Sequence, residues 1–276
     1  MPKKNRNLRW SDNLVYVQKI PLSSCYNRNR NIKGAKMMND FSENLAIIVK
    51  NIGCDYEKID KSYSGQQITE LYLREYEKGR QNGYTPVILS CDDSLAEILE
   101  INSGDIDEYK SKLLSINSDC GREFLRKRFE EQVKDIKKYL GSTSSLYGDF
   151  DDTIESQVIL DNSSSADLII AKIPTLNSWE IFAWIPFGGW NECPDAEDMM
   201  AVCKYWYELY KAVPAVISGD TLELYCFEPV RNKSDALKLA EEHYGFCNDI
   251  IEQGMQEIKP LASLLMNSKV WSFWWD

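Results

Sequence analysis

One cysteine and one histidine have the residue types that nucleophilic catalysis needs. Cys193 lies in the segment FGGWNECPDAEDMM, just ahead of an expected helix, where the helix dipole favours the thiolate form. His243, the single histidine of the chain, could accept the thiol proton as a general base. Acidic residues at 195, 197 and 198 oppose the thiolate. We therefore favour the competing interpretation, a buried thiol and a packed helix histidine.

The same histidine precedes Cys247 by four residues, a spacing that puts both side chains on one helix face. Zinc sites use such pairs but need further ligands at motif spacing, and the sequence offers none. We predict no metal site. The sequence also lacks G-x-S-x-G, P-loop, G-x-G-x-x-G and H-E-x-x-H motifs, so we expect no cofactor.

Two carboxylates flank an expected hairpin turn. Asp220 lies in the turn, and Glu223 follows on a strand, where it shares one face with Tyr225. Paired acids can perform general acid–base catalysis or bind Mg²⁺. An Asp in a two-residue turn more often serves the turn geometry, so we favour a structural role.

A glycine pair, Gly188 and Gly189, separates an apolar run from an acidic helix start. Glycines at this place often cradle phosphate groups. The acids of the first helical turn repel an anion, and no Lys or Arg follows before Lys204. We therefore expect the glycines to serve the turn. Trp190, expected to be exposed, and Asn191 are candidates to line a pocket for a neutral or cationic group.

These residues leave two hypotheses about function open. One is a small hydrolase-like enzyme with a pocket around Trp190, Asn191, Asp220 and Glu223. The other, which we favour, is a non-enzymatic binding or interaction protein. Convergence of the four side chains on one concave pocket would favour the enzyme, and their dispersal would favour the binding protein.

The elements that must position these residues follow from apolar periodicity. In the first half, the apolar runs at 45–50 and 86–91 indicate buried strands, and residues 66–80 carry a helical stripe. Together they predict a β-α-β unit with parallel strands and a right-handed crossover. Ser94 predicts a capped helix start, and a longer helix is expected at 119–140.

The second half alternates in the same way. The expected strands are 167–173, 179–185, 213–218 and 221–227, and the expected helices are 195–210, 234–254 and 259–267. Pro194 suits the first position of its helix, while Ser234 and Gly254 are the expected start and stop of theirs. Gly219 with the following Asp predicts a type II′ hairpin turn.

Aromatic residues concentrate near the end of the chain. Seven of the eight tryptophans fall in the final hundred residues, and the segment VWSFWWD (270–276) is apolar on both faces. Such a cluster could form a stacking or protein-binding surface. Because period-2 spacing favours core packing, we predict that VWSFWWD is a buried strand of a sheet.

Charge is distributed unevenly along the chain. The total is −11, but residues 1–36 carry nine Lys or Arg and one acid, so this basic arm is +8 and the remainder −19. The acidic balance disfavours membrane and nucleic-acid partners, apart from the basic arm, and a protein partner is the expectation. We favour an arm that folds back on the acidic body over one that grips an anionic partner.

The eight cysteines are scattered, and none belongs to a Cys-x-x-Cys pair. The N-terminus has no apolar stretch of the kind that a secretory signal needs, and no run approaches the length of a membrane-spanning helix. Buried free thiols are therefore expected rather than disulfides or zinc ligands. We predict a cytoplasmic protein.

Four spaced motifs of the second half resemble a known family. GGWNECP, SGDTLELY, HYGFCNDIIEQG and VWSFWWD occur in that order and are similar to the uncharacterised bacterial domain-of-unknown-function family 4253. The resemblance implies a bacterial origin and an α/β domain, but no catalytic residues. Because some members occur near toxin-related genes, it also implies partner binding, as in an immunity-type protein.

We therefore expect a mixed α+β (α/β) protein in two halves, each a mixed sheet flanked by helices. Between them, GSTSSLYGDFDD marks a change in composition. The expected divisions are a basic arm at 1–36, an N-terminal region at 37–140, a linker at 141–155 and a C-terminal domain at 156–276.

Overall fold

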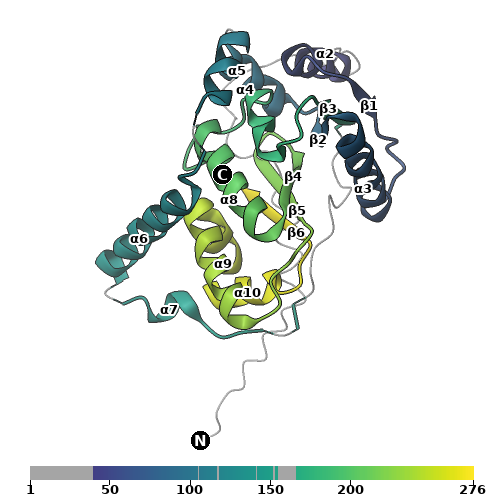
Figure 1. Ribbon diagram of the computed structural model, residues 1–276. Helices are drawn as coiled ribbons and strands as arrows, with labels where there is room; N and C mark the ends of the chain where they lie inside the picture. Colours follow the sequence, from purple (N-terminus) through teal and green to yellow (C-terminus); the bar gives the residue numbers. More distant parts are fainter. Residues whose placement is uncertain (1–39, 105, 117, 141, 152, 155–165) are drawn as a thin grey trace, which may run out of the picture. The chain divides into compact units, whose positions relative to one another are not determined.

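The computed structural model describes residues 40–276 except 105, 117, 141, 152 and 155–165 (Figure 1). The basic arm predicted at 1–36 lies outside the described residues. The strands are β1 (Tyr56–Lys58), β2 (Thr85–Ser90), β3 (Leu168–Ile173), β4 (Ala212–Ile217), β5 (Thr221–Cys226) and β6 (Val270–Trp274). The α-helices are α2 (Asp40–Ile52), α3 (Gly65–Asn82), α4 (Asp93–Ser103), α5 (Ile106–Leu114), α6 (Gly121–Leu140), α7 (Ser144–Tyr147), α8 (Ala196–Tyr210), α9 (Lys233–Phe246) and α10 (Ile258–Leu265). A 3₁₀ helix, η2 (Ser178–Ala183), and a π-helix, η3 (Ile250–Met255), complete the described elements.

One mixed sheet holds the described strands together, and its order is β1-β3-β2-β4-β5-β6. β2 pairs antiparallel with β3 and parallel with β4, and the other neighbours are antiparallel. The mixed α+β class is therefore confirmed, but the expectation of a separate sheet in each half is wrong. The cause is β2, whose six residues are all buried and which pairs on both edges with strands of the second half.

Helices cover the two faces of this sheet unequally. On one face, α3 packs Ile68, Tyr72 and Tyr76 against alternate strand residues such as Ile88 and Val213. The opposite face carries the larger core, to which α2, α4, α6, η2, α8, α9 and α10 contribute (Figure 1). Strand residues one position apart mostly reach different cores, as the alternation of strand side chains requires, but at the bulge in β4 two successive residues share one core.

The predicted β-α-β unit is wrong in its first element. Residues 45–50 belong to helix α2, where Leu45, Ile48 and Ile52 are buried. Their spacing of three and four residues is that of a helix face, and the short apolar run concealed it. The helix at 66–80 and the strand at 86–91 are confirmed as α3 and β2, and the helix at 119–140 as α6.

The strand predicted at 179–185 is also wrong, because these residues form η2 and the turn that follows it. Ile181, Phe182 and Ala183 are buried side by side, as a short helix enclosed by other elements allows. A continuous apolar run does not distinguish a buried strand from a buried helical turn. The other predicted strands, 167–173, 213–218 and 221–227, are confirmed as β3, β4 and β5.

Helix starts lie one or two residues from their predicted positions. Asp92 rather than Ser94 caps α4, with its carboxylate accepting from the backbone N–H of Leu95 at 2.8 Å. Asp195 caps α8, so Pro194 precedes the helix instead of opening it. In each case the carboxylate reaches an unpaired N–H of the first turn, which an Asp does as well as a Ser.

The helix predicted at 234–254 is interrupted. Asn232, not Ser234, caps α9, and the chain leaves the α-helix after Phe246 before η3 begins at Ile250. Gly254 does not end η3, because Gln256 adopts the left-handed conformation after it, with φ 62°. The helix predicted at 259–267 is confirmed as α10.

The hairpin between β4 and β5 is confirmed, but its turn is not type II′. That turn needs a positive φ at Gly219, which Gly219 does not have. The glycine is required for close packing instead, because a Cβ there would collide with the Cβ of Ser94 on α4.

Strand β6 is confirmed where the segment VWSFWWD predicted it, pairing with β5 at one edge of the sheet. Trp271, Phe273 and Trp275 are at most 2% exposed. At the last residue of this strand, the Cys247 thiol donates to the backbone oxygen of Trp274 at 2.9 Å, which ties the strand end to the segment after α9.

The cysteines of the described residues are free thiols, as expected, but the expectation that they are buried is wrong for two of them. Cys54 is half-buried, Cys120 is exposed, and Cys91, Cys193, Cys203, Cys226 and Cys247 are buried. Within the described part of the chain, no helix combines the length and the apolar character that crossing a bilayer requires.

Candidate functional site

The two groups proposed for nucleophilic catalysis are both enclosed in the core. Cys193 is 6% exposed, and burial raises the pKa of its thiol far above the ordinary range. Its neighbourhood therefore favours the neutral thiol over the thiolate that attacks a substrate. Its backbone N–H donates to the oxygen of Trp190 at 2.9 Å, so the residue closes a tight loop.

His243 is fully buried on α9 among aromatic rings. Its ring centroid lies 4.7 Å from that of Phe273, 4.9 Å from that of Trp271 and 5.1 Å from that of Trp206. Neither ring nitrogen has a hydrogen-bond partner among the described residues, and burial lowers the pKa of the imidazole to about 3. This surrounding is that of a packed neutral ring.

Cys247 does not form a metal pair with His243. Its thiol donates to Trp274, and burial raises its pKa to about 12. Among the residues that the structure describes, no group of three or more His, Cys, Asp or Glu side chains lies close enough to hold a metal ion.

The predicted carboxylates lie on the sheet and at its turn. Asp220 accepts from the hydroxyl of Thr221 at 2.8 Å and from that of Ser218 at 3.3 Å, which supports the hairpin turn. Glu223 is 9% exposed on β5, opposite Ser272 of β6. Because β5 alternates its faces, Glu223 points to the face that α3 covers, away from the core that holds His243.

The glycine loop closes on itself. Gly188 and Gly189 have φ angles of 103° and 84°, and the N–H of Gly189 donates to the backbone oxygen of Pro194 at 3.1 Å. Trp190, expected to be exposed, is instead half-buried, with its ring 4.8 Å from Phe187 in an edge-to-face contact. Asn191 donates to the backbone oxygen of Asp276 at 2.6 Å.

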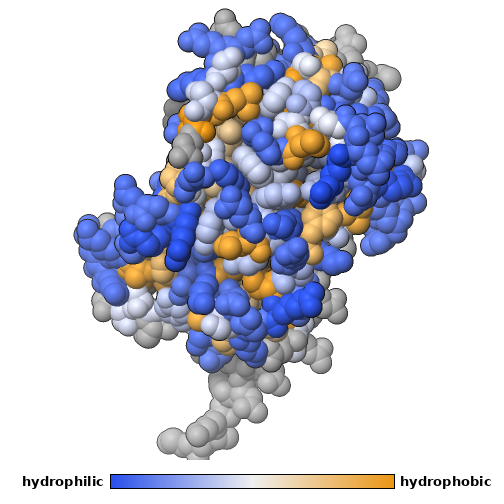
Figure 2. Space-filling model, viewed as in Figure 1, coloured by the Kyte–Doolittle hydropathy of each residue, from blue (hydrophilic) through white to orange (hydrophobic). Residues whose placement is uncertain are grey.

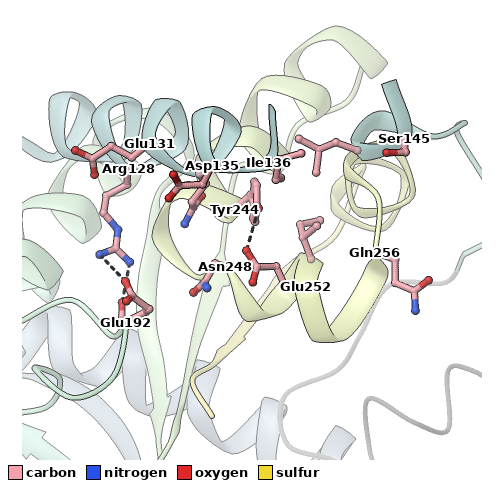
Figure 3. A pocket seen from close by; sticks show the side chains of 13 residues that line it. Arg128, Glu131, Asp135, Ile136, Ser145, Glu192, Tyr244, Asn248, Glu252 and Gln256 are labelled. Carbon is pink, nitrogen blue, oxygen red and sulfur yellow. Dashed lines mark hydrogen bonds and ion pairs between the residues drawn. The ribbon is translucent and has the colours of Figure 1, made fainter. Parts of the chain in front are cut away.

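A surface cavity of about 680 Å³ lies elsewhere, between α6 on one side and the α9–η3 segment on the other (Figure 3). We call it the α6–η3 cavity. Its lining residues are Arg128, Glu131, Gln132, Asp135, Ile136, Ser145, Leu146, Glu192, Tyr244, Asn248, Ile251, Glu252 and Gln256. None of the nine candidate site residues singled out from the sequence is among them, and the loop that holds Gly188 and Gly189 contributes only Glu192.

The one cation of the lining is engaged by its neighbours. The Nη2 of Arg128 donates to the backbone oxygen of Glu192 at 2.8 Å, and its Nη1 lies 3.4 Å from the Glu192 carboxylate. Its Nε donates to the backbone oxygen of Gly245, at the end of α9, at 3.4 Å. Figure 3 shows this pair at one end of the cavity.

Three further carboxylates face the cavity, and the described residues of the lining include no second cation that could pair with them. Glu131 and Asp135 project from one face of α6, one turn apart, and Glu252 projects from η3 (Figure 3). The phenol of Tyr244 donates to Glu252 at 3.1 Å, and burial raises the pKa of that phenol well above its usual value. The cavity is therefore acidic.

Two amide side chains in the wall are incompletely bonded. The Oε1 of Gln132 and the Oδ1 of Asn248 are buried and have no hydrogen-bond partner among the described residues. Buried acceptors are ordinarily paired, so unpaired ones beside a cavity are consistent with a bound group that supplies N–H donors.

Close packing fixes the distance between α6 and α9. A Cβ on Gly245 would lie 2.6 Å from the backbone oxygen of Leu125, so α9 and α6 touch through a glycine. The opposite wall is a π-helix, a form that often occurs at functional sites because it displaces side chains from the regular helical path.

Sequence reasoning missed this cavity because its residues lie on helix faces that look like ordinary solvated surface, and the surface over α6 is mainly hydrophilic (Figure 2). One signal was present. Glu131 and Asp135 stand four residues apart on one helix, an arrangement of like charges that costs a helix about 0.2–0.5 kcal/mol. A helix that retains such a pair is a place to look for a positively charged neighbour.

The part of the chain from β3 onward carries the similarity to a known family. Residues 169–276 match the Domain of unknown function (DUF4253). The resemblance drawn from the four motifs is thereby confirmed for the C-terminal part. No curated protein and no solved structure matches the chain.

DUF4253 supplies only one wall of the cavity. Glu192, Tyr244, Asn248, Ile251, Glu252 and Gln256 lie within the matched residues. The wall formed by α6 and α7 precedes them in the chain. The site therefore depends on both the domain and the segment ahead of it.

Proposed function

We propose that this chain is a non-enzymatic binding protein and that the α6–η3 cavity is its binding site. The observation that carries the proposal is the cavity itself, since 680 Å³ lies within the range of sites that hold small molecules or side chains of a partner. The acidic groups and unpaired amide oxygens in its wall give it the polar anchors that such sites use.

The position of the candidate catalytic groups also supports binding over catalysis. Cys193 and His243 are enclosed and neutral, and Glu223 lies on the opposite face of the sheet from His243. Nucleophilic catalysis needs the nucleophile and its base within hydrogen-bond reach of each other and of a substrate. The immunity-type partner that the family resemblance implies is compatible with this proposal.

The proposal is tested by filling the cavity. Gln132→Trp places an indole in its wall, and Gln66→Trp on the exposed surface of α3 is the matched control. The full chain, each variant and a Cys193→Ser/Glu223→Gln variant are immobilised and used to capture ligands from a host extract. We expect the cavity variant alone to lose a ligand that the other three retain.

Two outcomes would contradict the proposal. Either the ligands captured by the Gln132→Trp variant equal those captured by the parent, or the Cys193→Ser/Glu223→Gln variant accumulates a compound that the parent converts. Circular dichroism and denaturant unfolding of each variant show that a lost ligand does not reflect a lost fold.

A further inference from the structure

We infer that the α6–η3 cavity binds an extended organic cation that carries a protonated amine or guanidinium group. This inference rests on the proposed function and names the ligand class of the same site. It is carried by the charges, the unpaired acceptors and the apolar surface of the lining, taken in turn below.

The charge of the lining favours a cation. Four carboxylates and one guanidinium face the cavity. Since the guanidinium of Arg128 is already held by Glu192 and by the backbone oxygen of Gly245, the carboxylates of Glu131, Asp135 and Glu252 dominate the potential inside. An ammonium or guanidinium group meets complementary charge there, and an anion is repelled.

The unpaired amide oxygens need N–H donors. Gln132 and Asn248 each hold a buried oxygen without a partner among the described residues. Both residues belong to the lining of the cavity, where a bound ligand can supply those donors. Ammonium and guanidinium groups carry several donors and no acceptor, so they suit such a wall.

The apolar part of the lining suits a hydrocarbon stem. Ile136, Leu146 and Ile251 line the cavity together with the ring of Tyr244. Lysine-like chains place their methylene groups on apolar surface while the charged head reaches polar groups. The cavity therefore offers an aliphatic bed beside carboxylates, which fits an amphipathic cation.

A metal ion fits this lining less well. Among the described residues no three of the acidic side chains approach each other as ligands of one ion must. Carboxylates spread over two helices instead suit a ligand that carries its charge at the ends of a chain. A volume of about 680 Å³ also exceeds the space that a single ion occupies.

The first experiment compares three ligands of equal length but different charge. The full-length protein is titrated calorimetrically with 1,5-diaminopentane, with 1,5-pentanediol and with glutarate. We expect heat of binding from the diamine alone, and weaker binding as salt is added, because salt screens the attraction between charges. Binding of the diol or of glutarate at the cavity with equal or higher affinity would overturn the inference.

The second experiment removes charge from the wall without changing its shape. The double variant Glu131→Gln/Asp135→Asn should bind the diamine about tenfold more weakly, since two exposed ion pairs with the ligand are lost. Glu130→Gln is the matched control, because Glu130 lies on α6 beside these residues but outside the lining. Equal affinity in the double variant and the control would overturn the inference.

Two peptides distinguish the source of the cation. Blocked Gly-Lys-Gly and Gly-Arg-Gly carry the same charged groups as a protein partner would, and whichever of the diamine and the peptides binds more tightly identifies the source.

Failure of this inference is separable from failure of the proposed function. If the Gln132→Trp variant loses a captured ligand that proves to be neutral or anionic, the cavity is a binding site but its ligand is not a cation. If no cation binds and the Gln132→Trp variant captures the same ligands as the parent, both this inference and the proposed function are wrong.

Discussion

At the scale of single residues, His243 is packed as a hydrophobic side chain is. Three aromatic rings enclose it, and its two nitrogens have no partner among the described residues. Burial disfavours the charged imidazolium, so the pKa falls from 6.5 to about 3. The residue is thus neutral throughout the physiological range, and its contribution is to stability.

This lowered pKa makes a prediction about acid. The unfolded chain binds a proton at His243 below about pH 6.5, whereas the folded protein does so only near pH 3. The stability that the neutral ring contributes is therefore complete above pH 6.5 and is lost as the pH falls, by about 1.4 kcal/mol per pH unit. The His243→Met variant has no imidazole to protonate, so it does not lose stability in this way as the pH falls.

The measurement is the free energy of unfolding by urea from pH 7 to pH 4, for the parent and for His243→Met. We expect the difference between the two to shift in favour of the variant as the pH falls. Taking the difference removes the contribution of the acidic residues, which titrate in both proteins. A difference that stays constant with pH would contradict the buried, unpaired position of the ring.

At the scale of elements, the position of α6 depends on glycine. Gly245 on α9 faces the backbone of Leu125 and Phe129 so closely that a side chain cannot be added without movement. Along the same interface Arg128 ties α6 to the backbone oxygen of Gly245. The distance between the cavity walls is thus set by contact between two helix backbones.

Gly245→Ala tests this contact. The added methyl group would lie 2.6 Å from the backbone oxygen of Leu125, so α6 must move away from α9. We expect the free energy of unfolding to fall by about 1–3 kcal/mol, as for overpacked cores, although alanine favours a helix more than glycine does. Chemical denaturation measures this, and an equal or greater stability would show that the interface can relax at little cost.

The elements divide clearly into those that sequence patterns predict and those that they do not. Long amphipathic stretches, such as α3 and α6, were predictable because their helical periodicity extends over several repeats. The short apolar runs of β2 and β3 were predicted correctly as buried strands. The segments at 45–50 and 179–185 were not predictable, because a run of six or seven mostly apolar residues fits either a strand or a buried helical turn. What surrounds them in the fold decided between the two.

At the scale of the whole molecule, β2 links the two parts of the chain. It pairs with β3 over six residue positions and with β4 on its other edge. The described residues accordingly all lie within one compact unit, residues 35–276. A sheet that takes its central strand from outside the DUF4253 match cannot be completed by the matched residues alone.

We therefore expect the fragment 166–276 not to fold alone. Without β2 the facing edges of β3 and β4 are unpaired, and apolar residues such as Ile170 and Val216 lose their neighbours. The fragment should show red-shifted tryptophan emission and no cooperative unfolding, and co-expression with residues 40–151 should restore both. A fragment that melts cooperatively by itself would show that DUF4253 is independent of β2.

The candidate site was the least predictable feature, and the reason lies at this same scale. Its walls come from segments more than a hundred residues apart, for example Asp135 and Glu252, and no local pattern joins them. The residues singled out from the sequence were chosen for reactive types, and Cys193 and His243 proved to be core positions. Reactive residue types mark a site only where the fold leaves them accessible.

The exposure of the acidic residues on α6 has a consequence for how this protein can change over generations. Glu131 and Asp135 project from the side of the helix that meets solvent, and neither belongs to the core. Substitution at such positions typically alters stability by no more than about 0.5 kcal/mol. Mutation can therefore alter the selectivity of the cavity while the matched domain and its aromatic core stay unchanged. One face of a single helix would let descendants of this chain acquire new ligands at almost no risk to folding.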